Sequence, residues 1–166
     1  ILAPEENEFV IDVCAAPGGK AVHIAQLMKN RGLVAARDIR EQKVKLIRDS
    51  ADRLGIDIIR TEVRDALVPD EGLYGRADRV LVDAPCTGLG VIRKKPDIKW
   101  RRTEEQVEEL SGLQRKMLDV CGRYVKKGGT LVYSTCTTEP EENTEVLNAF
   151  LAGNPGFSPG DFSALL

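Results

Sequence analysis

The 166-residue sequence predicts a doubly wound α/β fold with a mostly parallel sheet. Short apolar runs alternate with amphipathic helical patterns, as expected for strands joined by helical crossovers. A pair of glycines directly follows the first apolar run, where a ligand can lie against the backbone. Acidic or thiol side chains follow the other runs. Because the carboxyl ends of parallel strands meet at one edge of a sheet, we expect that edge to carry the chemistry.

Composition limits the classes of protein that the chain can belong to. The 24 basic and 26 acidic residues give a net charge of −2, so contact with nucleic acid requires a local basic patch. The sequence has no signal-peptide pattern and no apolar run of membrane length, which predicts a cytoplasmic protein without membrane contact. Its four cysteines are widely spaced, which argues against a metal site and a disulfide framework. We expect one domain over 1–166 and a monomer.

The first predicted strand, helix and turn form a ligand-binding unit. An apolar strand over 9–13 ends in a Pro-Gly-Gly turn, and a helix follows over 20–30. Neither the dinucleotide fingerprint nor the phosphate loop is present, since the glycines are adjacent and Lys20 is followed by Ala21. An adenosine-bearing cofactor other than NAD or ATP is therefore predicted. The alternative is a turn that only connects two elements.

Acidic residues follow the next strands. The strand over 33–38 ends at Asp38, which is suited to ribose hydroxyls or to capping the helix predicted over 40–54. A strand over 56–63 precedes Asp65, which can accept from an adenine amino group or serve as a turn acid. The fourth strand, over 77–82, leads into Asp83 and a Pro-Cys-Thr-Gly segment that contains Cys86.

The segment 93–102 is strongly basic and holds the only tryptophan. Because Pro96 disfavours a helix through it, we expect an ordered loop. Cations around a large ring suit RNA phosphates and stacked bases, although a solvated surface is the alternative. The candidate RNA-binding residues are Arg93, Lys94, Lys95, Lys99, Trp100, Arg101 and Arg102.

The last third of the chain completes the alternation. A long helix is predicted from 103 to about 125, with Cys121 on its apolar face, and a fifth strand over 130–134. Cys136 follows that strand. A final helix starts at the capping residues 138–141 and runs through Leu151, and the residues from 161 to 166 are too few for a further strand pair.

Four segments, 14–20, 83–88, 93–102 and 134–137, together resemble the RsmB/NSUN family of RNA cytosine-5 methyltransferases, and most closely its bacterial 16S ribosomal RNA members. The resemblance implies a Rossmann-like class I methyltransferase fold, S-adenosylmethionine as cofactor and RNA, most simply ribosomal RNA, as partner. Family members also carry an RNA-binding region before the first strand and two strands after the last helix, so a catalytic-domain fragment is expected. A tRNA substrate, or a cofactor-binding fragment without turnover, is the alternative.

The chemistry of cytosine methylation explains why two thiols and an acid are needed. A thiolate that adds to carbon 6 makes carbon 5 nucleophilic enough to attack the sulfonium methyl group. A nearby cation favours the ionised form of the thiol, and Lys20 or the basic segment can supply that positive charge. A protonated Asp83 can donate to the ring nitrogen. Unstacked cytosine is required, so we expect single-stranded or flipped-out RNA.

Chemistry alone does not decide which thiol attacks. DNA cytosine-5 methyltransferases use the cysteine of a Pro-Cys motif, here Cys86. The resemblance instead implies that Cys136 is the nucleophile and that Cys86 helps to release the product. A buried structural role is the usual fate of a cysteine and suits Cys14 and Cys121 better than Cys86 or Cys136.

The resemblance also implies the cofactor contacts. Asp38 would bind the ribose, Asp65 the surroundings of the adenine, and Asp83 would lie beside both cofactor and base. Lys43 stands where relatives often have arginine, and Leu89 interrupts a Thr-Gly-Thr-Gly pattern. The segment implied to bind the methionine end of the cofactor comprises Cys14, Ala15, Ala16, Pro17, Gly18, Gly19 and Lys20.

Overall fold

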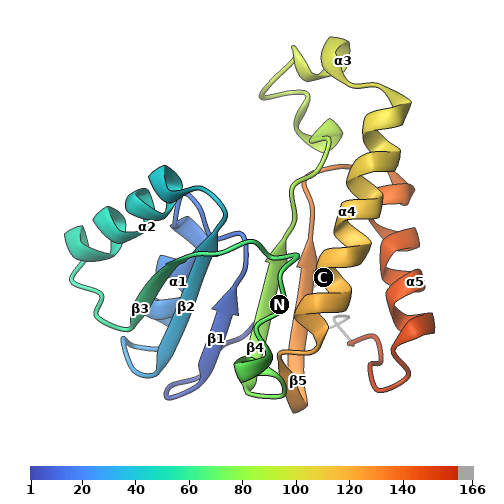
Figure 1. Ribbon diagram of the computed structural model, residues 1–166. Helices are drawn as coiled ribbons and strands as arrows, with labels where there is room; N and C mark the ends of the chain where they lie inside the picture. The colour runs from blue at the N-terminus through green and yellow to red at the C-terminus, as the bar shows by residue number, and fades with distance from the viewer. Residues whose placement is uncertain (161–166) are drawn as a thin grey trace. The chain divides into compact units, whose positions relative to one another are not determined.

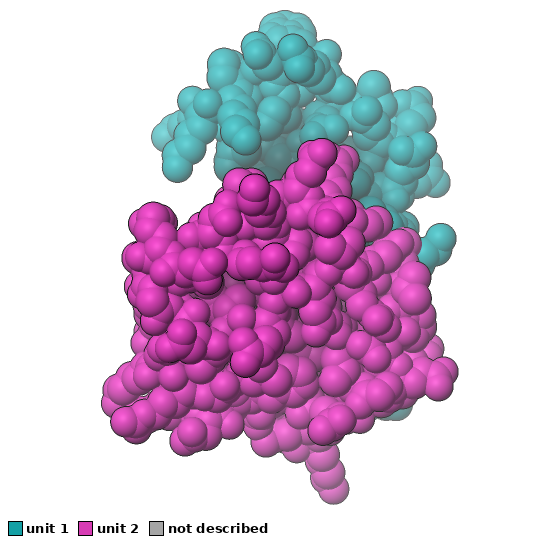
Figure 2. Space-filling model, turned by 60° about the vertical axis from the view of Figure 1, so that its left-hand side comes forward, with its two compact units in different colours: residues 1, 84–119, 133–166 teal, residues 2–83, 120–132 magenta. Residues whose placement is uncertain are grey.

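The computed structural model describes residues 1–160, which divide into two compact units. What we call the first unit comprises residues 2–83 and 120–132, magenta and labelled unit 2 in Figure 2. The second unit comprises residue 1, residues 84–119 and the described residues from 133 onward, teal and labelled unit 1 in Figure 2. Among the described residues, no helix is long and apolar enough to cross a membrane.

Five strands form one sheet in the order β3-β2-β1-β4-β5. Strand β1 pairs in parallel with β2 and β4, and β2 pairs in parallel with β3, which confirms the predicted fold class. The chain order reverses between β1 and β4, and open α/β sheets bind ligands outside the strand carboxyl ends at such a point. The strands are β1 (Phe9–Asp12), β2 (Leu33–Asp38), β3 (Ile59–Val63), β4 (Ala77–Asp83) and β5 (Val125–Ser134).

Two helices cover one face of the first unit's sheet, α1 (Gly19–Leu27) and α2 (Glu41–Arg53) (Figure 1). Their apolar residues pack on alternate residues of the strands, including Val10, Val34 and Ala36, because successive strand side chains point to opposite faces. This apolar layer holds the carboxyl ends of β1 and β2 at fixed positions.

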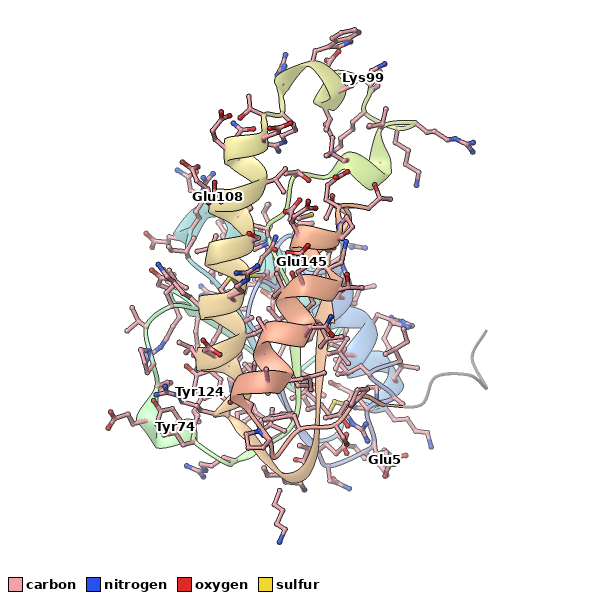
Figure 3. All side chains as sticks on the ribbon, turned by 90° about the vertical axis from the view of Figure 1, so that its right-hand side faces the viewer. Glu5, Tyr74, Lys99, Glu108, Tyr124 and Glu145 are labelled. Carbon is pink, nitrogen blue, oxygen red and sulfur yellow. The ribbon has the colours of Figure 1, made fainter. Side chains whose placement is uncertain are left out.

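The second unit contains the helices α4 (Glu104–Gly122, except its last residues) and α5 (Thr144–Gly153), which lie side by side (Figures 1 and 3). The Arg115 guanidinium on α4 is 3.8 Å from the Glu145 carboxylate on α5. The shorter elements are α3 (Ile98–Arg101) and the 3₁₀ turns η1 (Glu71–Leu73, in the first unit), η2 (Leu89–Val91) and η3 (Pro140–Glu142).

Several predicted boundaries were wrong. Helix α4 ends at Gly122 and β5 already begins at Val125, so the glycine pair at 128–129 lies within the strand. The segment 93–102 is not all loop, because α3 begins two residues after Pro96, where the proline does not interrupt helical hydrogen bonds. The final helix begins at Thr144, after η3, and β3 begins at Ile59. The prediction for residues 161–166 lies outside the described residues. Cys121 is fully buried, as predicted.

A buried arginine joins separate parts of the first unit. The Arg37 guanidinium on β2 donates to Glu62 at 2.7 Å and to Asp70 at 2.9 Å, and it lies over the ring of Tyr124. The Tyr124 hydroxyl in turn accepts the Asp70 backbone N–H at 3.1 Å. Figure 3 shows Tyr124 beside Tyr74, with ring centroids 6.1 Å apart. One cation thus ties β2 to the segment after β3 and to the chain just before β5.

We therefore expect Arg37→Met to lower the free energy of unfolding by about 3 kcal/mol, because the carboxylates of Glu62 and Asp70 lose their buried, positively charged partner. Urea unfolding followed by circular dichroism measures the loss. Arg53→Met, at the exposed end of α2, is the matched control and should cost less than about 0.5 kcal/mol. Equal losses in the two variants would contradict the role given to Arg37.

Candidate functional site

The turn after β1 is held between two strands and leaves open space at Gly19. Val13 donates its N–H to Leu81 on β4 at 3.1 Å, and Ala15 donates to Arg37 on β2 at 2.8 Å. Gly18 has φ 111° and precedes α1, and a Cβ there would lie 3.1 Å from the Ile47 Cα. A Cβ on Gly19 would meet nothing within 4 Å. The first N–H groups of α1 can therefore be approached closely by a ligand.

The predicted acids of the first unit lie at the ends of its strands. Asp38 is buried, and its carboxylate accepts the Arg40 backbone N–H at 3.0 Å, with the Lys43 ammonium 3.9 Å away. Asp65 accepts the Leu67 N–H at 2.9 Å, the contact expected of a turn acid. Each of these acids keeps a second carboxylate oxygen that accepts no hydrogen bond given for the described residues.

Lys20 and Asp83 form an ion pair, with the ammonium nitrogen 2.5 Å from a carboxylate oxygen. The two residues come from the start of α1 and the end of β4. In this contact Asp83 accepts a hydrogen bond from the Lys20 ammonium. The role expected of Asp83 toward the base stays a prediction.

Asp12, at the end of β1, is a candidate site residue that was not among the residues predicted from the sequence. Its side chain is fully buried, and neither carboxylate oxygen makes a hydrogen bond of good geometry with the described residues. Burial raises the pKa of Asp12 to about 7. The negative charges of Asp83 and Asp38 also raise it, whereas the Cys14 backbone N–H and the Lys20 ammonium lower it. The sequence could have indicated Asp12, because it is an acidic residue at the end of an apolar run. Burying a charged carboxylate there costs free energy unless a partner compensates the charge.

Cys14 lies in the same acidic surroundings. Burial raises the pKa of its thiol to about 12, and the negative charges of Asp12, Asp38 and Asp83 raise it further. The Cys14 thiol is therefore neutral at physiological pH and unsuited to attack.

In the second unit, the two predicted reactive cysteines lie in direct contact. The Cys86 and Cys136 sulfur atoms are 3.1 Å apart, and the Cys136 backbone N–H donates to the Cys86 sulfur at 3.2 Å. Cys136 is exposed and Cys86 is half-buried. Burial, followed by the hydrogen bond with Cys136, raises the pKa of the Cys86 thiol to about 11. Cys136 is thus the more accessible of the two thiols. We call them the thiol pair.

Backbone contacts surround the thiol pair closely. Gly90 donates its N–H to the Cys136 carbonyl at 3.1 Å, and a Cβ on Gly90 would lie 2.9 Å from that oxygen. Gly88 has φ 77°, and a Cβ there would lie 3.8 Å from the Cys136 sulfur. The departure at Leu89 therefore falls between two glycines that both pack against Cys136.

Three buried polar residues beside the Cys86 loop were not predicted from the sequence. Thr87, Gln114 and Glu142 are all fully buried, and the first two both donate hydrogen bonds to Glu142. Glu142 belongs to an acidic run with Glu139 and Glu141, a pattern typical of a solvated surface. The sequence carries no local signal that sets it apart.

One residue of the basic segment contacts the cysteine-bearing loop. The Arg102 guanidinium donates to the Thr87 carbonyl at 2.8 Å, which brings a cation to the residue after Cys86. At the other end, Trp100 is 80% exposed and Lys99 lies 5.2 Å from its ring centroid; Figure 3 shows Lys99 on α3. The Trp100 ring and the Lys99 side chain are thus both exposed.

Comparison with known proteins identifies the family. The sequence model of the family described as "16S rRNA methyltransferase RsmB/F" matches residues 1–159. The chain belongs to the RsmB/F family. This confirms the resemblance found in the sequence.

Two curated relatives illustrate the match. The chain is 50% identical over 159 residues to the "Probable ribosomal RNA small subunit methyltransferase B" of Bacillus subtilis, covering 95% of this chain and 36% of that protein. It is 44% identical to the ribosomal RNA small subunit methyltransferase B of Shewanella oneidensis, covering 92% of this chain and 35% of that protein. The chain thus spans about a third of the length of these relatives.

Solved structures agree with this assignment. NSun6 from Pyrococcus horikoshii with SFG aligns with a TM-score of 0.84 and 37% identity, covering 92% of this chain and 39% of that one. A SAM-dependent O-methyltransferase from Thermotoga maritima shares the fold at 19% identity and a TM-score of 0.64, covering 92% of this chain and 46% of that one. These structures confirm the predicted class I methyltransferase fold.

The first unit fits the expected cofactor chemically. S-adenosylmethionine carries an ammonium group, ribose hydroxyls and an adenine. A buried Asp12 carboxylate without a partner suits a cation, the acceptor oxygens of Asp38 suit hydroxyl donors, and Gly19 leaves open space. Among the described residues no cluster of three potential metal ligands is found.

We expect the buried Asp12 to make stability depend on pH. Between pH 4 and 7 the folded chain retains a proton that the unfolded chain, with a pKa of 3.8, has released, so stability falls as pH rises through this window. Asp12→Asn should raise the free energy of unfolding at pH 8 by about 1–3 kcal/mol and have little effect at pH 4.

Urea unfolding at a series of pH values tests this, with Asp52→Asn on the exposed surface of α2 as control. A difference between Asp12→Asn and the original chain that does not vary with pH would contradict the prediction. Isothermal titration with S-adenosylmethionine should show weaker binding to Asp12→Asn and unchanged binding to Asp52→Asn.

Proposed function

We propose that this chain is the catalytic part of a methyltransferase that transfers a methyl group from S-adenosylmethionine to carbon 5 of a cytosine in 16S ribosomal RNA. The observation that carries the proposal is the thiol pair, in which an exposed Cys136 touches a less accessible Cys86. A covalent adduct at carbon 6 needs one accessible thiol, and a second thiol can assist its release. Membership of a 16S rRNA methyltransferase family supports the substrate class.

In this proposal the first unit binds the cofactor, which supplies an electrophilic methyl group on a sulfonium sulfur. The N–H groups after Gly18 and the segment from Cys14 to Lys20 hold its methionine end. Asp12 compensates its ammonium charge, because an unpartnered buried carboxylate gains most from a cation. Asp38, with Lys43 beside it, accepts the ribose hydroxyls, and Asp65 accepts from the adenine.

Cys136 is the proposed nucleophile. Its sulfur is exposed, whereas burial keeps the pKa of Cys86 near 11 and its thiol protonated at physiological pH. The Cys136 thiolate adds to carbon 6, and carbon 5 takes the methyl group. A water molecule then takes the carbon 5 proton, the C–S bond breaks and Cys136 leaves as a thiolate. Cys86, in contact with the sulfur that leaves, assists this last step. Arg102 at the Thr87 carbonyl supplies positive charge near the thiols.

The Lys20–Asp83 ion pair is proposed to serve the ring nitrogen of cytosine. Negative charge develops on the ring when the thiolate adds, so a proton must be offered to that nitrogen. The pair holds such a proton on Lys20, and Asp83 orients it at 2.5 Å. Donation passes from the ammonium either directly or through Asp83.

The basic segment is proposed to hold the RNA, with Trp100 stacking on a base and Arg93, Lys94, Lys95 and Arg101 contacting phosphates. The target cytosine is unstacked in this proposal. Because the chain is close to neutral and spans about a third of its relatives' length, the rest of the protein is expected to add to RNA affinity.

Transfer of labelled methyl groups to defined transcripts tests the proposal. We expect label on carbon 5 of cytosine in a 16S rRNA transcript, found by nuclease digestion and mass spectrometry. A tRNA transcript should stay unlabelled. Label on another base or atom, or cofactor binding without transfer in the full-length protein, would contradict it.

Separate cysteine variants test the two thiol roles. We expect Cys86→Ala to accumulate a covalent RNA adduct, because release is slowed, and Cys136→Ala to form none and lose methyl transfer by a factor of about 10³ or more. Denaturing gels with labelled RNA measure the adduct. Cys121→Ala, at a buried position away from both thiols in sequence, is the control and should behave as the original chain does. An adduct that accumulates in Cys136→Ala would reverse the roles.

A further inference from the structure

We propose that the buried carboxylate of Glu142 is the positioning residue of the thiol pair, holding the Cys86 loop and the Cys136 loop together through Thr87 and Thr137. The positioning itself stands on the contacts of the second unit alone. Only its consequence for catalysis rests on the function proposed above.

Glu142 is an unusual buried acid because its charge is met by hydrogen bonds. The side chain is fully buried, and one carboxylate oxygen accepts the Thr87 N–H at 3.0 Å and the Gln114 amide at 2.9 Å. The other oxygen accepts the Thr87 hydroxyl in a short hydrogen bond. No lysine or arginine of the described residues forms an ion pair with it. A buried carboxylate is tolerated when several donors converge on it in this way.

These donors fix the chain on both sides of Cys86. Thr87 directly follows Cys86 and gives both its N–H and its hydroxyl to Glu142. The Gln114 amide that binds Glu142 also donates to the carbonyl of Pro85, directly before Cys86, at 2.9 Å. The backbone on either side of the Cys86 sulfur is therefore anchored to one carboxylate, directly or through one amide.

The Cys136 loop is joined to the same network by a single hydroxyl. The Thr87 and Thr137 hydroxyl oxygens are 2.9 Å apart. Because the Thr87 proton goes to Glu142, Thr137 is the donor in this contact. Thr137 directly follows Cys136, so the residues after the two cysteines pair with each other just as the cysteines do. Asn143, next to Glu142, also donates to the Thr137 carbonyl at 3.1 Å.

The network uses both acceptor oxygens of the carboxylate, because the Thr87 N–H and the Gln114 amide meet one oxygen and the Thr87 hydroxyl meets the other. A glutamine keeps one acceptor oxygen and replaces the other by an NH₂ group, which cannot accept the Thr87 hydroxyl proton.

The neighbouring acids have different surroundings. Glu141 and Glu145 line an open cavity of about 740 Å³ beside α4, together with Glu108 and Arg115, and Figure 3 shows Glu108 and Glu145 on the two helices. Glu145 therefore offers a matched control.

The test measures how readily the two thiols react with each other. Oxidised glutathione converts the thiol pair to a disulfide and releases two molecules of reduced glutathione, and the equilibrium constant gives the effective concentration of one thiol beside the other. We expect Glu142→Gln to lower this effective concentration by about tenfold or more, and Glu145→Gln to leave it unchanged. Peptide mapping verifies that the bond joins Cys86 to Cys136.

A second pair of variants keeps the test valid if Glu142→Gln unfolds. Thr87→Val removes the hydroxyl between Glu142 and Thr137 at nearly constant size, and Thr87→Ser retains it. Thr87→Val should lower the effective concentration, and Thr87→Ser should restore most of it. Circular dichroism and urea unfolding establish that each variant is folded under the conditions used.

Three outcomes would overturn the inference: an unchanged effective concentration in folded Glu142→Gln, equal values for Thr87→Val and Thr87→Ser, or no Cys86–Cys136 disulfide in the original chain. In the full-length enzyme, Glu142→Gln should lower kcat with little change in KM for S-adenosylmethionine. If the thiol test succeeds and no variant methylates cytosine, the positioning role stands and the proposed function fails.

Discussion

The contact between the Cys86 and Cys136 sulfur atoms constrains everything around it, because it joins two loops that are 50 residues apart in the chain. Two thiols at this separation leave little freedom to the backbone that carries them. The chain meets this demand with glycines at 88 and 90, which allow the Cys136 loop to approach, and with a buried carboxylate that gathers donors from the Cys86 loop. The two thiols differ in exposure, because Cys136 is exposed and Cys86 is half-buried.

The first unit shows a different use of a buried carboxylate. Glu142 is fully satisfied by hydrogen bonds, whereas Asp12 has none of good geometry among the described residues, and its pKa rises to about 7. A satisfied buried acid fixes structure, and an unsatisfied one favours a cationic ligand. The same residue class thus positions groups in one unit and prepares for binding in the other. The loss of folding stability expected from the buried Asp12 matches a common observation, in which residues that serve binding lower the stability of the fold.

Much of the fold and part of the site followed from local patterns. Apolar runs with acids at their ends predicted the parallel strands and Asp38, Asp65 and Asp83, because strand ends are local features. Glu142, Gln114 and the Lys20–Asp83 pairing depend on contacts between distant segments, and their sequence surroundings look like ordinary surface. The start of β5 was missed because the glycine pair at 128–129 resembles the end of a helix, and sheet pairing overrides that preference.

The central claim is that Cys136 forms the covalent bond to the base. RNA that carries 5-fluorocytosine at the target position tests it most directly, because fluorine at carbon 5 prevents the final elimination and leaves the adduct on the attacking sulfur. Digestion and mass spectrometry of the trapped complex should find the methylated nucleotide on the peptide that contains Cys136. A nucleotide on the peptide that contains Cys86, or none on either, would contradict the account.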